Sequence, residues 1–348
     1  MKNLLKRITE KKRKLDQFQP LPHGVVKNLE DWLNVELTYS SNRIEGNTLT
    51  RIETAEVIEK GVSAVISGKA LVDQLEAVNH ARAIEQMHWI STQIKSHNEI
   101  TEAHINSIHK IILTRIDDEW AGRYREDEVF IRGTDVELPM PQRVPYLMKD
   151  FADWLAQGKK PHPILIAADA HFKFVSIHPY RDGNGRTARL LMNLILLKND
   201  YPLAIIRAED RTEYLNALNV AQKKGDFEPF YTIIAQAVER SLDAYLNITE
   251  GKPALAPLTK LKREPQETIG PETYGELLKI GELAKETGET VHTLRYWTKL
   301  GLLKVTNYSE GGYQLYHANM IKRAEKIRTL QKEQRLPLDE IKKHLTHN

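Results

Sequence analysis

Twelve consecutive residues near the middle of the chain, 178–189 (HPYRDGNGRTAR), limit the folds that are open to it. Apolar residues at helical spacing flank them on both sides, over 164–175 and over 190–197. Gly183 and Gly185 allow a tight turn just before the second apolar run begins. The pattern predicts a glycine-rich loop between two apolar helices, and the loop opens the second of these helices.

The same loop has the composition of a phosphate-binding site. Backbone N–H groups and the helix dipole converge at a helix N-terminus and attract anions. Arg186 and Arg189 are three residues apart, so they share one face of the first turn, where a bound polyphosphate would offset their unfavourable interaction with the dipole. His178 has the near-neutral titration of a general base. Asp182 supplies one oxygen ligand of the kind that Mg²⁺ takes alongside phosphate.

Residues 178–189 resemble the Fic motif, HPFx(D/E)GNGRxxR, with Tyr180 in place of Phe. The resemblance implies a helical Fic domain over about 29–246 and an enzyme that transfers AMP from ATP to a Ser, Thr or Tyr hydroxyl of a target protein. In the reaction that the resemblance implies, His178 takes the proton of the target hydroxyl and Asp182 holds Mg²⁺. Gly185 favours nucleotidyl transfer, because kinase-like Doc relatives carry Lys there. The implied phosphate-binding residues are Gly183, Asn184, Gly185, Arg186 and Arg189.

Two further segments fit this resemblance. Residues 128–138 predict a β-hairpin that resembles the family's flap, which pairs with an extended stretch of the target; a purely structural hairpin is the alternative. Residues 211–218 resemble the helix that borders the adenine, and ordinary core packing is the alternative there. The flap residues are Val129, Phe130, Ile131, Arg132, Gly133 and Thr134, and the adenine-facing residues are Leu215, Leu218 and Gln222.

An upstream segment, 41–47 (SNRIEGN), resembles the Fic inhibitory motif, (S/T)xxxE(G/N). Ser41 and Glu45 are four residues apart and point the same way on a helix near 36–47. The resemblance implies autoinhibition, in which Glu45 pairs with Arg189 and keeps that arginine from the γ-phosphate of ATP. A solvated surface carboxylate is the alternative interpretation of Glu45.

Four prolines within 251–273 predict an extended linker, because proline fits neither helix interiors nor central strands. The linker separates a domain over 1–250 from a smaller domain over 274–348, in which basic residues exceed acidic ones. We therefore expect a mainly α fold in which a helical Fic domain with a β-hairpin flap precedes a small winged helix-turn-helix domain.

The smaller domain resembles the DNA-binding domain of MerR-type regulators over about 277–345. Residues 293–297 match the signature T-x-R-Y-(Y/W), whereas Gln314 replaces the usual arginine of the wing and removes one phosphate contact. The resemblance implies DNA binding, and a protein–protein module of the same fold is the alternative. The residues implied in DNA contact are Arg295, Tyr296, Lys299, Lys304 and Tyr313.

The amino-acid composition excludes several kinds of functional site and several classes of protein. The chain has no cysteine, which excludes disulfides, thiolate nucleophiles, zinc fingers and iron–sulfur clusters. No apolar run approaches the ~20 residues of a membrane span, so we expect a cytoplasmic protein that does not bind membranes. An ATP-sensing transcriptional regulator and a de-AMPylating or other nucleotidyl-transferring Fic protein remain alternatives, and a homo-oligomer in which a neighbouring chain masks the flap stays open.

Overall fold

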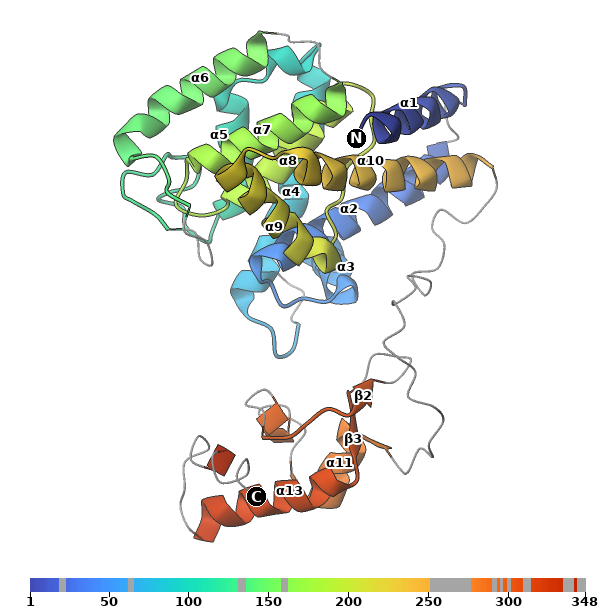
Figure 1. The fold of residues 1–348 in the computed structure, drawn as a ribbon, viewed down its shortest axis with the longest axis vertical. Helices are drawn as coiled ribbons and strands as arrows, with labels where there is room; N and C mark the ends of the chain where they lie inside the picture. The colour runs from blue at the N-terminus through green and yellow to red at the C-terminus, as the bar shows by residue number, and fades with distance from the viewer. Residues whose placement is uncertain are drawn as a thin grey trace. The chain divides into compact units, whose positions relative to one another are not determined.

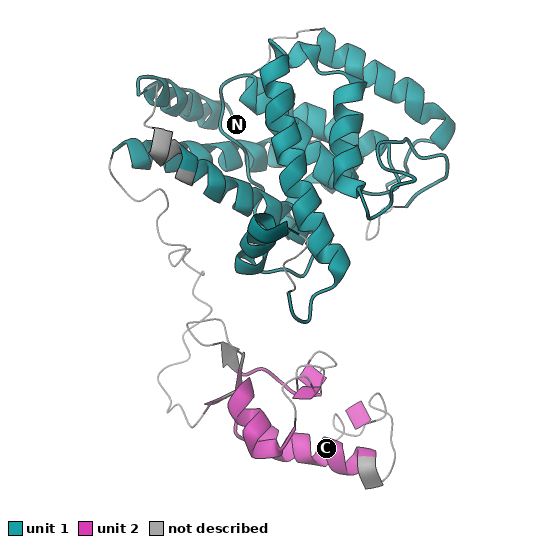
Figure 2. Cartoon of the chain, turned by 180° about the vertical axis from the view of Figure 1, so that it is seen from behind, with its two compact units in different colours: residues 1–260 teal, residues 261–348 magenta. Residues whose placement is uncertain are grey.

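The computed structural model divides into two compact units, 1–260 and 261–348 (Figure 2). It describes residues 1–18, 23–61, 66–130, 136–157, 162–250, 277–289, 293–294, 297–298, 302–308, 314–333 and 341–342. The predicted linker, 251–273, lies outside the described residues. Each unit is considered by itself below.

The first unit is built from helices (Figure 1), as the sequence predicts. Its α-helices are α1 (Lys2–Asp16), α2 (His23–Glu45), α3 (Arg51–Lys60), α4 (Leu71–Gln93), α5 (Glu102–Leu113), α6 (Val144–Ala156), α7 (Pro163–Ile177), α8 (Asn184–Leu197), α9 (Arg211–Lys224) and α10 (Glu228–Thr249). Among the described residues, the short 3-10 turns η2 (His97–Glu99), η3 (Pro141–Arg143) and η4 (Ala208–Asp210) join some of them. None of the described helices is long and apolar enough to cross a lipid bilayer.

Helix α8 forms the centre of this unit. It packs against α2, α4, α5 and α7, and residues 186–196 are all buried. A helix that is buried on every side must be largely apolar, which explains the run LLMNLILL at 190–197; its one polar side chain, Asn193, bonds to the Ala204 backbone. Its N-terminus carries the predicted loop, so the core of the unit fixes the position of that loop.

Two local signals place the end of α2. Gly46 has a φ of +108°, a backbone conformation that residues with a side chain rarely adopt, and the helix therefore ends at Glu45. A capping box then starts α3: the Thr50 side chain accepts the N–H of Glu53, and the Glu53 carboxylate accepts the N–H of Thr50. Glu45 consequently lies at a fixed helix terminus.

Helix α1 is tied to α10. Ile8 is fully buried between them, and Arg7 and Lys11 form ion pairs with Glu239. Several basic residues of this first helix therefore have partners within the first unit.

The second unit has a small sheet and a buried core. Strands β1 (Leu277–Lys279), β3 (Gln314–His317) and β2 (Asn307–Tyr308) pair antiparallel in the order β1-β3-β2, and helices α11 (Ile280–Thr287) and α13 (Asn319–Glu333) accompany them. The pairing of Tyr308 with Gln314 matches the predicted wing, whose tip lies outside the described residues. Trp297 is buried in this core and packs the domain.

Among the residues of the first unit whose burial is described, His80, His109 and His171 are buried. Burial lowers the pKa of His171 to about 3 and that of His109 to about 4. Burial, together with Arg189 and Arg186, also lowers the pKa of His80 well below its ordinary value. All three side chains are therefore neutral in the folded chain near pH 7.

We expect the free energy of unfolding to fall as the pH drops from about 7.5 to about 5.5. The unfolded chain binds protons at its histidines near the ordinary pKa of 6.5, whereas the folded chain does not until a lower pH. Below pH 6.5 each such histidine lowers stability by ~1.4 kcal/mol per pH unit. Urea unfolding of His171→Gln should show a shallower pH dependence than the wild type, and identical slopes would contradict the assignment.

Candidate active site

The loop between α7 and α8 is closed by its own side chains. His178 ends α7 in the left-handed conformation (φ +50°), and Gly183 caps α8 with a φ of +74°. The buried Asn184 side chain accepts the N–H of Tyr180 at 2.9 Å and donates to the Tyr180 carbonyl at 2.8 Å. These two bonds make a tight ring of the segment 180–184, so the loop keeps one shape.

His109 of α5 holds this loop from below. Its Nδ1 accepts the N–H of Gly122 at 2.9 Å, and its Nε2–H therefore donates to the Asp182 carbonyl, also at 2.9 Å. The imidazole stacks on the Tyr180 ring, with centroids 3.5 Å apart and planes 3° from parallel. The Tyr180 hydroxyl in turn donates to the Asn106 side chain. The loop is thus fastened to α5 at two points, His109 and Asn106.

Arg125 holds the other end of the loop. Its buried guanidinium donates to the His178 carbonyl at 2.8 Å and to the Pro139 carbonyl at 2.5 Å, and its backbone N–H donates to the Pro179 carbonyl. Pro139 follows the predicted flap segment. A single cation therefore links the backbone of His178 to the base of the flap.

His178 is arranged as a base. Its Nδ1 lies 3.3 Å from the Val175 carbonyl, an acceptor, so this nitrogen carries the proton and Nε2 keeps a free lone pair. Burial lowers the pKa of His178 to about 4, and Arg125 acts in the same direction, while the bond to Val175 opposes them. At neutral pH the side chain is an unprotonated imidazole that can accept a proton.

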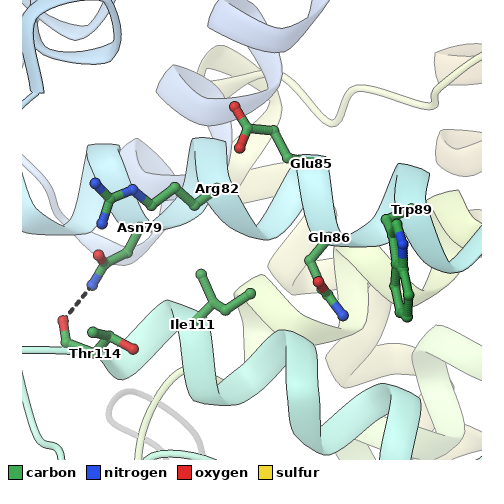
Figure 3. Close-up of a pocket in the computed structure, with 7 residues that line it drawn as sticks. All are labelled: Asn79, Arg82, Glu85, Gln86, Trp89, Ile111 and Thr114. Carbon is green, nitrogen blue, oxygen red and sulfur yellow. Dashed lines mark hydrogen bonds between the residues drawn. The ribbon is translucent and has the colours of Figure 1, made fainter.

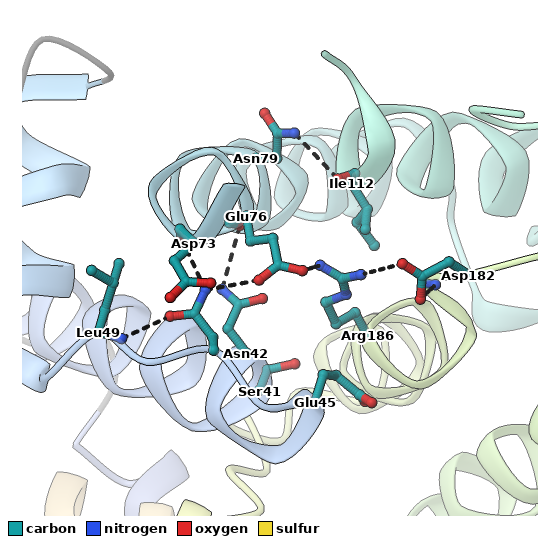
Figure 4. A network of polar contacts seen from close by, with 12 residues as sticks. Ser41, Asn42, Glu45, Leu49, Asp73, Glu76, Asn79, Ile112, Asp182 and Arg186 are labelled. Atoms are coloured by element: carbon teal, nitrogen blue, oxygen red, sulfur yellow. Dashed lines mark hydrogen bonds and ion pairs between the residues drawn. The ribbon is translucent and has the colours of Figure 1, made fainter. Parts of the chain in front are cut away.

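Two buried arginines project from the first turns of α8, and acidic side chains hold both. Arg186 donates from Nη1 to Glu76 at 2.9 Å and from Nη2 to Asp182 at 3.3 Å (Figure 4). Arg189 donates to the hydroxyl and the carbonyl of Ser41, both at 2.9 Å, and to the Glu45 carboxylate at 2.7 Å.

The predicted inhibitory residues thus meet the predicted phosphate-binding residues. Ser41 and Glu45 lie on the last turns of α2, and both contact Arg189. The Glu45 carboxylate also lies directly against Gly185, where any side chain would collide with it. The carboxylate therefore covers the N-terminus of α8, the place that the sequence assigns to phosphate.

Asp182 fits the role of a ligand to a nucleotide-bound cation. Its side chain is 69% exposed and lies at the N-terminus of α8. Among the described residues, no group of three or more His, Asp or Glu side chains could hold a metal by itself. Mg²⁺ commonly takes one carboxylate and completes its shell with phosphate and water, so this donor set suits Mg²⁺ that arrives with a nucleotide.

The predicted adenine-facing and flap residues differ in how far they are buried. Leu218 is buried in the core, whereas Leu215 is exposed and Gln222 donates weakly to Ser176 of α7, two residues before His178. Val129 is half-buried and Phe130 is 91% exposed. The described residues on either side of 131–135 carry no strand, and the predicted hairpin tip, Ile131, Arg132, Gly133 and Thr134, lies outside the described residues.

Of the residues predicted to contact DNA, Lys304 is described and exposed. The other four, Arg295, Tyr296, Lys299 and Tyr313, lie outside the described residues.

A separate surface cavity of about 440 Å³ lies between α4 and α5 (Figure 3). Asn79 at its edge donates to the carbonyls of Ile112 and Thr114 and so ties the two helices together. None of the predicted site residues lines this cavity. Its lining residues are Asn79, Arg82, Glu85, Gln86, Trp89, Ile111 and Thr114.

Comparison with known proteins places this geometry in a family. Residues 99–196 match the Fic/DOC family. Fic-1 from C. elegans has a solved structure that superposes with a TM-score of 0.64 at 32% identity, covering 72% of this chain and 73% of that one. The chain belongs to the Fic/DOC family. A Fic domain containing signaling protein from Bacteroides thetaiotaomicron superposes with a TM-score of 0.62 at 27% identity, covering 73% of this chain and 99% of that one.

Curated Fic relatives extend the likeness beyond the motif. The protein adenylyltransferase Fic of Nematostella vectensis is 39% identical over 249 residues, which are 71% of this chain and 56% of that protein. The chain spans about half the length of the curated relatives it matches. Residues 278–348 match a second family, the MerR HTH family regulatory proteins, which agrees with the predicted C-terminal domain.

Sequence reasoning missed three residues of this Fic site, namely Glu76, His109 and Arg125. Each lies more than fifty positions before the residue that it contacts in the motif. No local sequence pattern indicates which residue each of them contacts. A lone charged or imidazole side chain is usually solvated or part of a core, so its presence alone predicts no distant partner. The packing of α4 and α5 against α8 shows the roles of Glu76 and His109, and the contacts of Arg125 with the His178 and Pro139 carbonyls show its role.

Proposed function

We propose that this chain is a protein adenylyltransferase that transfers AMP from ATP to a Ser, Thr or Tyr hydroxyl of a target protein. The observation that carries the proposal is the neutral His178 imidazole beside a helix N-terminus that bears two arginines. The names of the curated Fic relatives support it.

The residues divide the reaction between them. The target hydroxyl oxygen bonds to the α-phosphorus, the bond from that phosphorus to the bridging oxygen breaks, and pyrophosphate leaves with the electron pair. His178 Nε2 accepts the hydroxyl proton. The N–H groups of residues 184–186 have no carbonyl within the helix to bond, so they are free for phosphate oxygens. Arg186 and Arg189 neutralise the charge of the β- and γ-phosphates.

Asp182 would hold Mg²⁺, which supplies charge neutralisation for the triphosphate when it is bound. The exposure of the Asp182 carboxylate supports this assignment.

Glu45 inhibits the enzyme in this conformation. Arg189 is 2% exposed, and its Nε and Nη2 donate to Ser41 and Glu45, so a γ-phosphate can take these donors only by displacing the Glu45 carboxylate. The position of that carboxylate against Gly185 also obstructs the phosphate-binding turn. Both effects favour the nucleotide-free state.

The target would dock beside the flap. Phe130, at the edge of the flap, is 91% exposed, and Met140 and Tyr146 on the following segment are also exposed. Large apolar side chains on a surface commonly mark a binding site for another protein. Arg125 joins this segment to the His178 backbone, so a docked target strand is held in register with the base.

The variant Glu45→Gly should transfer AMP at least about tenfold faster than the wild type, because the loss of one charge-assisted bond to Arg189 frees that arginine for phosphate. Transfer of label from α-labelled ATP to proteins of a cell lysate, and to the chain itself, measures this. The double variant with His178→Ala should transfer none. Equal rates in the wild type and Glu45→Gly would remove the inhibitory role, and equal rates with and without His178 would remove the base.

The C-terminal domain supports a second proposal, that the chain binds DNA. Its match to the MerR HTH family and its basic composition favour this role. An ATP-sensing regulator would use both domains without transferring AMP, and measurable transfer by Glu45→Gly would count against that alternative. De-AMPylation and a cytoplasmic location stay predictions.

Full-length protein should shift genomic DNA fragments in a gel, with an affinity that falls steeply as salt rises, because phosphate contacts release counterions. The substitution Arg295→Ala should weaken this binding by roughly tenfold through the loss of a phosphate contact. Arg7→Ala, whose guanidinium pairs with Glu239 in the other unit, is the control and should bind as the wild type does. Binding that is absent, or that is insensitive to salt, would favour the protein–protein module.

A further inference from the structure

Arg186 lies between two carboxylates that differ sharply in exposure. The arginine side chain is 2% exposed, Glu76 of α4 is 17% exposed, and Asp182 is 69% exposed. The shorter of its two contacts is the one to Glu76, at 2.9 Å against 3.3 Å. An anion that arrives from solvent therefore meets the side of the guanidinium that faces Asp182, while Glu76 lies behind it.

Glu76 is itself held in place from the other side. Its Oε2 accepts the side-chain N–H of Asn47 at 2.8 Å, while its Oε1 accepts Nη1 of Arg186. Both carboxylate oxygens are thus engaged. By contrast, Glu45 is 38% exposed, and its contact with Arg189 is made by a single oxygen.

Asn47 joins this pair to the inhibitory turn. It lies two residues after Glu45, and its side chain also donates to the Asp73 carbonyl at 2.9 Å and accepts the N–H of Leu49 at 3.0 Å. The asparagine therefore fastens the end of α2 to α4, and one side chain braces both the turn that carries Glu45 and the carboxylate that holds Arg186.

We propose that Glu76 is a positioning residue for phosphate binding: it fixes the guanidinium of Arg186 so that Nη2 of the arginine faces the N-terminus of α8. In this proposal, Asn47 holds the Glu76 carboxylate in place. The inference rests on the proposed function and deepens it. Glu76 lies on α4, outside the residues 99–196 that match the Fic/DOC family. The two carboxylates have opposite effects: Glu45 withholds an arginine from phosphate, and Glu76 presents one.

Burial explains why Glu76 is needed. A long guanidinium side chain loses rotamer freedom when it is fixed, and a buried cation needs an anionic partner when no nucleotide is present. The Nε of Arg186 is buried without a hydrogen-bond partner among the described residues, so the hold on this side chain comes from its two terminal nitrogens. Glu76 therefore sets the orientation that the nucleotide meets.

The test uses full-length Glu45→Gly protein, with and without Glu76→Gln, and measures the dissociation constants of ATP, ADP and AMP by calorimetry. We expect ATP and ADP to bind about tenfold more weakly to the double variant, because a charge-assisted bond to Arg186 is lost. AMP, which lacks the phosphates that Arg186 meets, should bind within about twofold of the parent. Glu76→Asp, which keeps the charge, should recover part of the ATP affinity.

Glu36→Gln is the matched control, because Glu36 is also buried and also pairs with an arginine, Arg51, outside the motif. It should leave all three dissociation constants as they are in the parent. An equal loss of AMP and ATP affinity in Glu76→Gln would show a merely structural role, and tighter ATP binding would show that Glu76 is a second inhibitory residue. Either result overturns the proposal.

A second variant covers the case in which Glu76→Gln does not fold. Asn47→Ala in the same Glu45→Gly background leaves the ion pair between Glu76 and Arg186 but removes the Asn47 hydrogen bond to Glu76. It should weaken ATP binding about threefold and leave the AMP dissociation constant unchanged. Unchanged ATP affinity there overturns the proposal. Failure of the Glu45→Gly parent to bind ATP at all would instead count against the proposed function, so the two failures are distinguishable.

Discussion

A buried guanidinium must be paired, and the donor of Arg189 that bonds Glu45 cannot at the same time bond a γ-phosphate. The side chain is almost completely buried, so its charge would be costly without a partner. Glu45 and Ser41 supply that partner within the chain. A nucleotide must offer a better one, because only the difference between the two pairings appears as binding free energy. The inhibition that we propose follows from this single competition.

The competition works because its surroundings are rigid. Gly46 ends α2 at Glu45, and the buried run of α8 fixes the arginines. Asn184 closes the loop on Tyr180, and His109 fastens the loop to α5. The groups that meet a nucleotide are therefore held in place before it arrives, which lowers the cost of orienting them during the reaction.

Much of this arrangement could be predicted from the sequence. Residues 178–189 carry their own helix boundary, turn glycines and charges, so the loop, its helices and the family follow from local pattern. The spacing of Ser41 and Glu45 likewise marks a helix face. Glu76 and Arg125 could not be found this way, because their roles depend on which helices meet in space, and a lone charged residue on a helix carries no mark of a distant partner.

The most direct measurement compares the affinities of ATP and ADP for the wild type and for Glu45→Gly. If Glu45 competes with the γ-phosphate for Arg189, the variant should bind ATP at least about tenfold more tightly than the wild type, and the gain for ADP, which has no γ-phosphate, should be smaller. Equal ATP affinities in the two proteins, or an equal gain for ATP and ADP, would contradict the competition.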